Sequence, residues 1–408
     1  MLAVKTKKKS IIKPKQSLFA FLIGLYVFTI FLYGARSETL FITDSAFSII
    51  VVLQMIYLIN SKFIINRIAL ISIPFLGLLM IGTVYSSNFA SSFSLVKTCL
   101  LLYMFMLILL ENLDNEEIIT LVLKYIMFAS FIMCVYIIYF YGFDRIVNAI
   151  TLGKRIGYEI SQPNTIGHYA AIGFVISIYN LLYDSMIRVK LFSVLISLTT
   201  FTIVLASLSR KALFLAIIGS FILYIGRESF KVTRVITFLI VLIMIYNLLS
   251  IIPQFIPFFD RLNSALSLML NSGIESNQSD ILRKQLIELG INMFKNRPLF
   301  GYGTGEFRYL AAALFGSEVA SHNNYIELAV NNGLFGLFAY YVPYIYMVTY
   351  YIKRIIPSKK GLGILLFSLL ITDLIISGMT MFTYISKISV LFFSLSLAYM
   401  VFNKKKLL

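Results

Sequence analysis

The chain has 408 residues, of which 59% are hydrophobic and only 13% are charged. Soluble domains carry about 25% charged residues, so this composition excludes an ordinary soluble protein, and the recurring apolar runs indicate a single membrane domain over 1–408. The formal net charge is +17, but the basic residues gather at the termini and in short loops, as topology signals do, which excludes nucleic-acid binding.

The N-terminal region combines a basic stretch, Lys5 to Lys15, with an apolar run over 18–35. No small-residue cleavage site follows, so we predict an uncleaved first span and not a signal peptide. Cys99 and Cys134 both fall inside later apolar runs. We interpret them as small packing residues, because neither a disulfide framework nor a metal-binding Cys pattern is present in the sequence.

Apolar runs predict the fold class. A helix needs roughly 20 apolar residues to cross the hydrocarbon layer. By this measure the chain is an all-α, polytopic membrane helix bundle of about twelve transmembrane helices. The predicted spans are 18–35, 44–59, 66–85, 93–110, 118–141, 165–183, 190–208, 211–226, 234–252, 333–352, 361–379 and 388–402.

The orientation follows from the basic residues. Most of those outside the spans lie in the two termini and in the short loops on the same side, so the positive-inside rule predicts that both termini are cytoplasmic. Two segments on the opposite side are longer, an outer loop over 142–164 and a large extracytoplasmic loop over 253–332. Long loops in compact proteins are usually functional, so we expect a site that faces outward.

The large loop carries two predicted amphipathic helices. The first covers Pro257–Leu270, and Ser279 or Asp280 can cap the second, which Pro298 ends. In the second helix apolar residues repeat every three to four positions, at Leu282, Leu286, Leu289 and Met293. Both helices are expected to lie on the membrane surface or over the bundle.

A glycine-rich segment follows, Asn296–Gly305. Glycines let backbone amides approach an anion closely, but a plain turn is the alternative. A dinucleotide-binding loop is excluded, because no strand precedes the segment and it lies outside the membrane.

Two residue types are candidates for chemistry on the outer side. His322 lies at a predicted helix start, where an imidazole can take a proton from a sugar hydroxyl; the alternative is an inert surface histidine. Arg210 lies in the tight hairpin between two spans, where a charge is costly, and its alternative role is snorkelling to lipid headgroups. Arg155 and Arg283 are further outer arginines, and His168 in the sixth span is interpreted as a packing residue.

The sequence also lacks certain motifs. No Asp-x-Asp pair that would hold a metal with a nucleotide-sugar lies outside, and no Walker motif occurs. We therefore predict no metal and no cofactor. A phosphate-activated donor bound by arginines fits better.

Four segments together resemble the O-antigen ligase and polymerase family of bacterial envelope glycosyltransferases. The resemblance covers about residues 150–345. It rests on Arg155-x-Gly157 with Gln162-Pro163-Asn164, on Ser209-Arg210-Lys211-Ala212, on Arg283 upstream of Arg297-Pro298-Leu299-Phe300-Gly301-Tyr302-Gly303-x-Gly305, and on Ser321-His322-Asn323-Asn324-Tyr325 with Asn332-Gly333-Leu334-Phe335-Gly336.

The resemblance implies a multi-pass glycosyltransferase of the bacterial cytoplasmic (inner) membrane. Its donor would be an undecaprenyl-diphosphate-linked oligosaccharide, its acceptor a glycan or a lipid-linked glycan, and its setting the membrane lipid, with other polysaccharide assembly proteins as candidate partners. Arg210 and His322 would be catalytic. Arg155, Asn164, Arg283 and Asn323 would bind substrate. Polymerase is favoured, ahead of a ligase to lipid A-core and a protein O-glycosyltransferase, because nothing suggests a region that binds a folded protein acceptor.

Two other classes of function compete with this interpretation. A polysaccharide or lipid-linked oligosaccharide flippase would also have about twelve spans, but it should carry charges buried within spans, and only Lys97 and Lys124 suit that requirement. A non-catalytic scaffold for an envelope complex would make each outer arginine dispensable.

Overall fold

The computed structural model describes residues 14–34, 37–59, 69–228, 232–250, 278–316 and 319–405. Every regular element in these ranges is a helix and none is a strand, which confirms the all-α prediction. The predicted helix Pro257–Leu270 lies outside the described residues.

The helices follow the predicted spans closely. In the first part of the chain they are α1 (Pro14–Tyr33), α2 (Leu40–Ile59), α3 (Ile73–Val84), α4 (Phe89–Asn112), α5 (Glu116–Tyr141), α6 (Phe143–Thr151), α7 (Pro163–Tyr183), α8 (Ile187–Ala206), α9 (Arg210–Gly226) and α10 (Val232–Ser250). The later ones are α12 (Gln278–Asn296), α13 (Glu306–Phe315), α14 (Asn324–Tyr350), α15 (Gly361–Thr372) with a π-helical continuation Asp373–Ser377, and α16 (Lys387–Lys405).

Side-chain caps fix several helix starts. The side-chain oxygens of Asn88, Asn115 and Ser209 each accept a hydrogen bond from a backbone N–H in the first turn of α4, α5 and α9. Such caps satisfy donors that a helix start would otherwise leave unpaired. Pro163 begins α7, where its missing N–H costs nothing.

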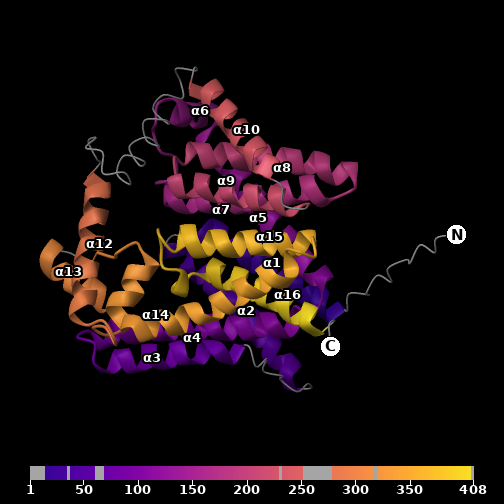
Figure 1. The fold of residues 1–408 in the computed structure, drawn as a ribbon. Coiled ribbons are helices and arrows are strands. Elements are labelled where there is room, and N and C mark those ends of the chain that lie inside the picture. The colour runs from indigo at the N-terminus through magenta and orange to yellow at the C-terminus, as the bar shows by residue number, and fades with distance from the viewer. Residues whose placement is uncertain are drawn as a thin grey trace.

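The long helices run side by side, and α12 and α13 stand at one end of the bundle (Figure 1). α7 packs against α5, α8 and α9, while α1 packs against α5 and α2. α15 packs against α9 and α16, and α16 packs against α4. α14 contacts both α3 and α12, so it links the bundle to the elements at its end. The last turn of α16 lies at the opposite end of the bundle from α12 and α13 (Figure 1).

Packing inside the bundle follows the rules of membrane helices. Large apolar side chains such as Phe21, Leu198 and Tyr139 point outward and are exposed, as lipid contact requires. Small residues sit at helix crossings: a Cβ added at Gly173 would lie 2.1 Å from Ser130 Oγ. Ser130 in turn donates a hydrogen bond to the carbonyl oxygen of Tyr169 (2.8 Å). Close approach and buried hydroxyl bonds of this kind stabilise helix pairs in lipid.

Six described helices are long and apolar enough to cross a membrane: α1, α2, α4, α5, α7 and α8. Three more apolar helices are shorter, at Leu70–Val84, Val232–Val241 and Gly361–Ser377. The chain is therefore a multi-pass helical membrane protein, and the count of about twelve spans stays a prediction.

The charges within predicted spans differ from expectation. Lys97 and Lys124 are exposed on the outside of the bundle. Another charged residue within a predicted span, Asp373 in 361–379, is buried. Its carboxylate accepts a hydrogen bond from Ser389 Oγ (3.0 Å), a fixed partner within the helix packing.

Helix α14 starts earlier than predicted span 333–352. It begins at Asn324, inside the segment expected to be loop, because Asn323 caps it. The helix is broken at Gly333, where φ is 63° and ψ is −160°. The start of the predicted span, residue 333, thus coincides with the break, and a helical segment of nine residues, 324–332, precedes it.

The predicted orientation can be tested with single cysteines. Leu314 in α13 and Ser358, between α14 and α15, are both exposed, and the native Cys99 and Cys134 are buried. We expect Leu314→Cys to react with an impermeant thiol reagent in intact cells, and Ser358→Cys to react only after permeabilisation. The reverse pattern would invert the topology.

Candidate active site

The turn before α14 leaves the side chain of His322 exposed on the protein surface. Asn323 Oδ1 accepts hydrogen bonds from the backbone N–H groups of Tyr325 (2.9 Å) and Ile326 (3.2 Å), so its side chain is used as a helix cap. His322, directly before it, has a φ of 51° and is exposed. A non-glycine residue with positive φ is uncommon. The turn therefore leaves the imidazole accessible at the start of α14.

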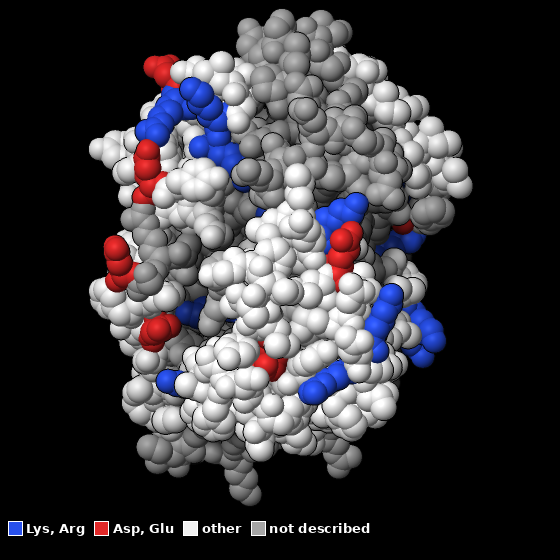
Figure 2. Space-filling view, turned by 90° about the vertical axis from the view of Figure 1, so that its left-hand side faces the viewer, with Lys and Arg blue, Asp and Glu red and all other residues white. Residues whose placement is uncertain are grey.

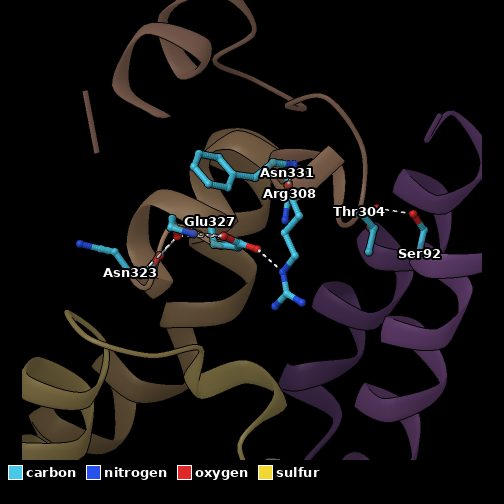
Figure 3. Close-up of polar contacts among 8 residues, drawn as sticks. Ser92, Thr304, Arg308, Asn323, Glu327 and Asn331 are labelled. Carbon is cyan, nitrogen blue, oxygen red and sulfur yellow. Dashed lines mark hydrogen bonds and ion pairs between the residues drawn. The ribbon is translucent and has the colours of Figure 1, made fainter. Parts of the chain in front are cut away.

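A buried carboxylate holds this turn in place (Figure 3). Glu327, in the first turn of α14, has no exposed side-chain surface. One oxygen, Oε2, accepts from Ser321 Oγ (2.8 Å) and from the Ser321 backbone N–H (3.4 Å). The other, Oε1, accepts from Arg308 Nε of α13 (3.3 Å). Burial raises the pKa of Glu327, whereas the charge of Arg308 and the bonds from Ser321 lower it.

Two arginines act on His322. Partial burial of the ring, and then the positive charges of Arg283 in α12 and Arg308 in α13, lower the pKa of His322 below its ordinary 6.5. The imidazole is therefore neutral at pH 7 and has a nitrogen lone pair that can accept a proton. The structure thus brings together His322, Asn323 and Arg283 from the predicted set, and it adds Arg308 and Glu327.

The glycine-rich loop has a structural role. The amides of Tyr302 and Gly303 donate to the carbonyl oxygens of Val330 and Asn331 (both 2.9 Å), and Thr304 N donates to Gly82 O (3.1 Å). Ser92 Oγ also donates to the Thr304 carbonyl (Figure 3). These amides are occupied by the chain itself. The plain-turn interpretation therefore holds, and an anion cradle at these amides does not.

Gly333 is required by a close backbone approach. A Cβ there would lie 2.2 Å from the carbonyl oxygen of Leu299, in addition to the positive φ. We expect Gly333→Ala to lower the melting temperature in detergent more than Gly142→Ala does. Gly142 also has a positive φ, 76°, but nothing lies within 4 Å of its added Cβ, so it carries only the cost of a backbone conformation that is essentially restricted to glycine, about 1–3 kcal/mol. Equal losses in the two variants would show that the Leu299 contact is not restrictive.

Arg210 begins α9, next to a second part of the site. The neighbouring Lys211 Nζ donates to Met381 Sδ (2.7 Å), in the segment that connects α15 to α16. The same segment reaches the start of α14, because Asn324 N donates to Gly378 O (2.7 Å). The hairpin with Arg210 and the turn with His322 are therefore joined through residues 378–381.

The first turns of α7, which contain Asn164, lie near this hairpin. Asn164 is in the first turn of α7, and a Cβ at Gly167 in the next turn would lie 2.4 Å from Ser207 Oγ, just before Arg210. Arg155 precedes α7, and its Nε is buried without a hydrogen-bond partner within the described part of the chain. Whether Arg155 and Asn164 share one site with His322 stays a prediction.

Charged side chains are sparse at the end of the bundle with α12 and α13 (Figure 2). The view onto this end shows a mostly uncharged surface, on which lysine, arginine and acidic side chains are scattered. Among the described residues, no three His, Cys, Asp or Glu side chains come together in a way that could hold a metal ion. The groups available at the site are thus guanidinium groups, an imidazole and amides.

The fold and the candidate site define a multi-pass helical membrane protein with an exposed histidine near two arginines, Arg283 and Arg308. Residues 192–341 match the family model described as O-antigen ligase. This confirms the family resemblance for the segment that runs from α8 into α14. The match includes Arg210, Arg283, His322 and Asn323, and it ends before α15. No curated protein matches the chain.

Proposed function

We propose that this protein is a glycosyltransferase that polymerises undecaprenyl-diphosphate-linked glycan repeat units on the outer face of the bacterial inner membrane, with ligation to a lipid acceptor as the next candidate. The observation that carries the proposal is the exposed His322 in the turn that Glu327 fixes together with Arg308, inside the segment that matches the O-antigen ligase family. Both chain termini are cytoplasmic in this proposal.

The proposed chemistry is an inverting displacement at the anomeric carbon. His322 removes the proton from the attacking hydroxyl of the acceptor while the bond between the anomeric carbon and the diphosphate oxygen breaks, and undecaprenyl diphosphate leaves with the electron pair on that oxygen. Arg210, Arg155 and Arg283 bind the diphosphate, because a guanidinium group makes charge-assisted, often bidentate, hydrogen bonds to phosphate oxygens. Asn164 and Asn323 are proposed to contact substrate through their side-chain amides.

The direct test is a reconstituted reaction. Purified protein in liposomes would receive a lipid-linked repeat unit, and the products would be separated by glycan length. We expect a ladder of chains that grows by whole repeat units. Movement of the intact lipid-linked unit across the bilayer without lengthening would instead favour the flippase.

Chelator treatment gives a separate prediction. We expect lengthening to continue in EDTA, because arginines supply the positive charge that a metal supplies in nucleotide-sugar enzymes. The measurement compares rates with and without chelator. Loss of activity that Mg²⁺ or Mn²⁺ restores would contradict the arginine-based mechanism.

A further inference from the structure

The guanidinium group of Arg308 contacts Glu327 and Phe382, and its remaining edge is partly exposed. Its Nε donates to Glu327 Oε1 (3.3 Å), and its Cζ lies 4.8 Å from the centre of the Phe382 ring. The side chain is 31% exposed, and within the described ranges its terminal nitrogens make no hydrogen bond. In Figure 3 the guanidinium end points away from Glu327, into the space between α14, the α15–α16 connection, and α3 and α4.

The pair that Arg308 forms with Glu327 is close to neutral. The carboxylate is fully buried and compensates the guanidinium charge. A compensated guanidinium attracts a diphosphate less than an uncompensated one does, but it still donates hydrogen bonds in a fixed geometry. Arg308 is thus better suited to neutral oxygen atoms, such as sugar hydroxyls, than to the anionic part of a donor.

The same carboxylate fixes the histidine turn. Glu327 Oε2 accepts from both the hydroxyl and the backbone N–H of Ser321, the residue before His322. One side chain therefore sets the position of Arg308 relative to His322. The charged groups around the imidazole come from three helices: Arg283 on α12, Arg308 on α13 and Glu327 on α14. The α15–α16 connection, residues 378–386, has no charged residue.

We propose that Arg308 forms the acceptor side of the site, where its free edge donates hydrogen bonds to neutral oxygen atoms of the acceptor sugar beside the attacking hydroxyl, and that Glu327 is the positioning residue for both Arg308 and His322. This inference rests on the proposed glycosyltransferase function. The arginines then differ in the substrate they bind, because Arg308 contacts the acceptor, whereas Arg210, Arg155 and Arg283 bind the donor diphosphate.

Two-substrate kinetics in liposomes test the division. The acceptor would be a lipid-anchored repeat-unit glycan without diphosphate, which can accept but cannot donate. We expect Arg308→Gln to raise the KM for this acceptor by roughly 10- to 100-fold, the range for hydrogen bonds to a charged group, and to change the donor KM by less than about twofold. A rise in donor KM, or no change in either KM, would overturn the proposal.

The control is a second arginine–glutamate pair on the outer side. Arg145 and Glu159 form an ion pair of 2.7 Å, with side chains 59% and 49% exposed. Exposed pairs contribute little, so Arg145→Gln should leave both KM values unchanged. If the wild-type protein does not lengthen the acceptor at all, the proposed function fails; if it does and Arg308→Gln behaves like Arg145→Gln, only the acceptor assignment fails.

The positioning role of Glu327 has its own readout. Glu327→Gln leaves the Arg308 charge uncompensated, which lowers the pKa of His322. The acid limb of the pH–rate profile, where the rate falls as His322 is protonated, should therefore move to lower pH. Arg308→Gln removes that charge, so the limb should move to higher pH. The double variant Glu327→Gln/Arg308→Gln leaves no unpaired buried charge and should fold, with a limb between the two and the high acceptor KM of Arg308→Gln. If the acid limb of the pH–rate profile stays at the wild-type pH in all three variants, the positioning role of Glu327 is overturned.

Discussion

Replacing Arg210 with alanine should abolish glycan lengthening while the protein stays in the membrane. Arg210 is the first residue of α9, and Ser209 caps that helix independently of it, so the helix start does not depend on the arginine side chain. Loss of one partner of a desolvated charge pair costs about 2–5 kcal/mol. The rate should therefore fall by roughly 30- to 5,000-fold. Arg210→Lys should recover little, because an ammonium group cannot reproduce the bidentate geometry on a phosphate.

The control for Arg210 lies on the same helix. Arg227 follows the last residue of α9 and is exposed at the other end. If Arg210 only anchored the helix in headgroups, Arg210→Ala and Arg227→Ala would behave alike. We expect Arg227→Ala to keep wild-type activity. Normal glycan lengths from well-expressed Arg210→Ala protein would show that this arginine is an anchor.

His322→Ala should lower turnover by roughly 10²- to 10⁴-fold, the usual contribution of a general base, and change donor affinity much less. An imidazole accepts a proton only in its neutral form. Because burial, Arg283 and Arg308 lower the pKa of His322 below 6.5, the wild-type rate should stay level through neutrality and fall only in more acidic buffer. That acid limb should vanish in His322→Ala.

A glutamine at this position separates chemistry from structure. His322→Gln keeps a hydrogen-bonding side chain in the turn but cannot act as a base near neutrality. Since the turn is held by Ser321, Asn323 and Glu327, the substitution should not unfold it. Substantial turnover in His322→Gln, measured on the same lipid-linked substrate, would remove the base assignment and leave the glycosyltransferase proposal in place.

The helices were predictable because lipid imposes long apolar runs. α12 was also accessible from its three- and four-residue repeat: it buries Leu286 and Met293 and ends at Asn296, before Pro298. α6 and α13 were missed, because helices of nine and ten residues leave too short a pattern. The early start of α14 has a local signal, the asparagine cap at Asn323, that a hydropathy window does not weigh.

The site was predictable only where its residues stand in a local motif. His322 and Arg210 could be found at a helix start and in a hairpin. Arg308 and Glu327 meet across α13 and α14, and nothing near either residue in the sequence indicates the pairing. Asp373 is different, because a carboxylate inside an apolar run is visible in the sequence. Its buried position was therefore predictable.

The hydrogen bonds between the glycine-rich loop and α14 also set an order of assembly during synthesis. The loop amides of Tyr302 and Gly303 need the carbonyl oxygens of Val330 and Asn331, and the amides of Leu334 and Phe335 bond back to Pro298 and Leu299. Until the ribosome has added those later residues, the amides of Tyr302 and Gly303 lack these partners. The outer elements therefore reach their final form only after the first half of α14 has left the translocation channel, so the site is completed late and from its C-terminal side.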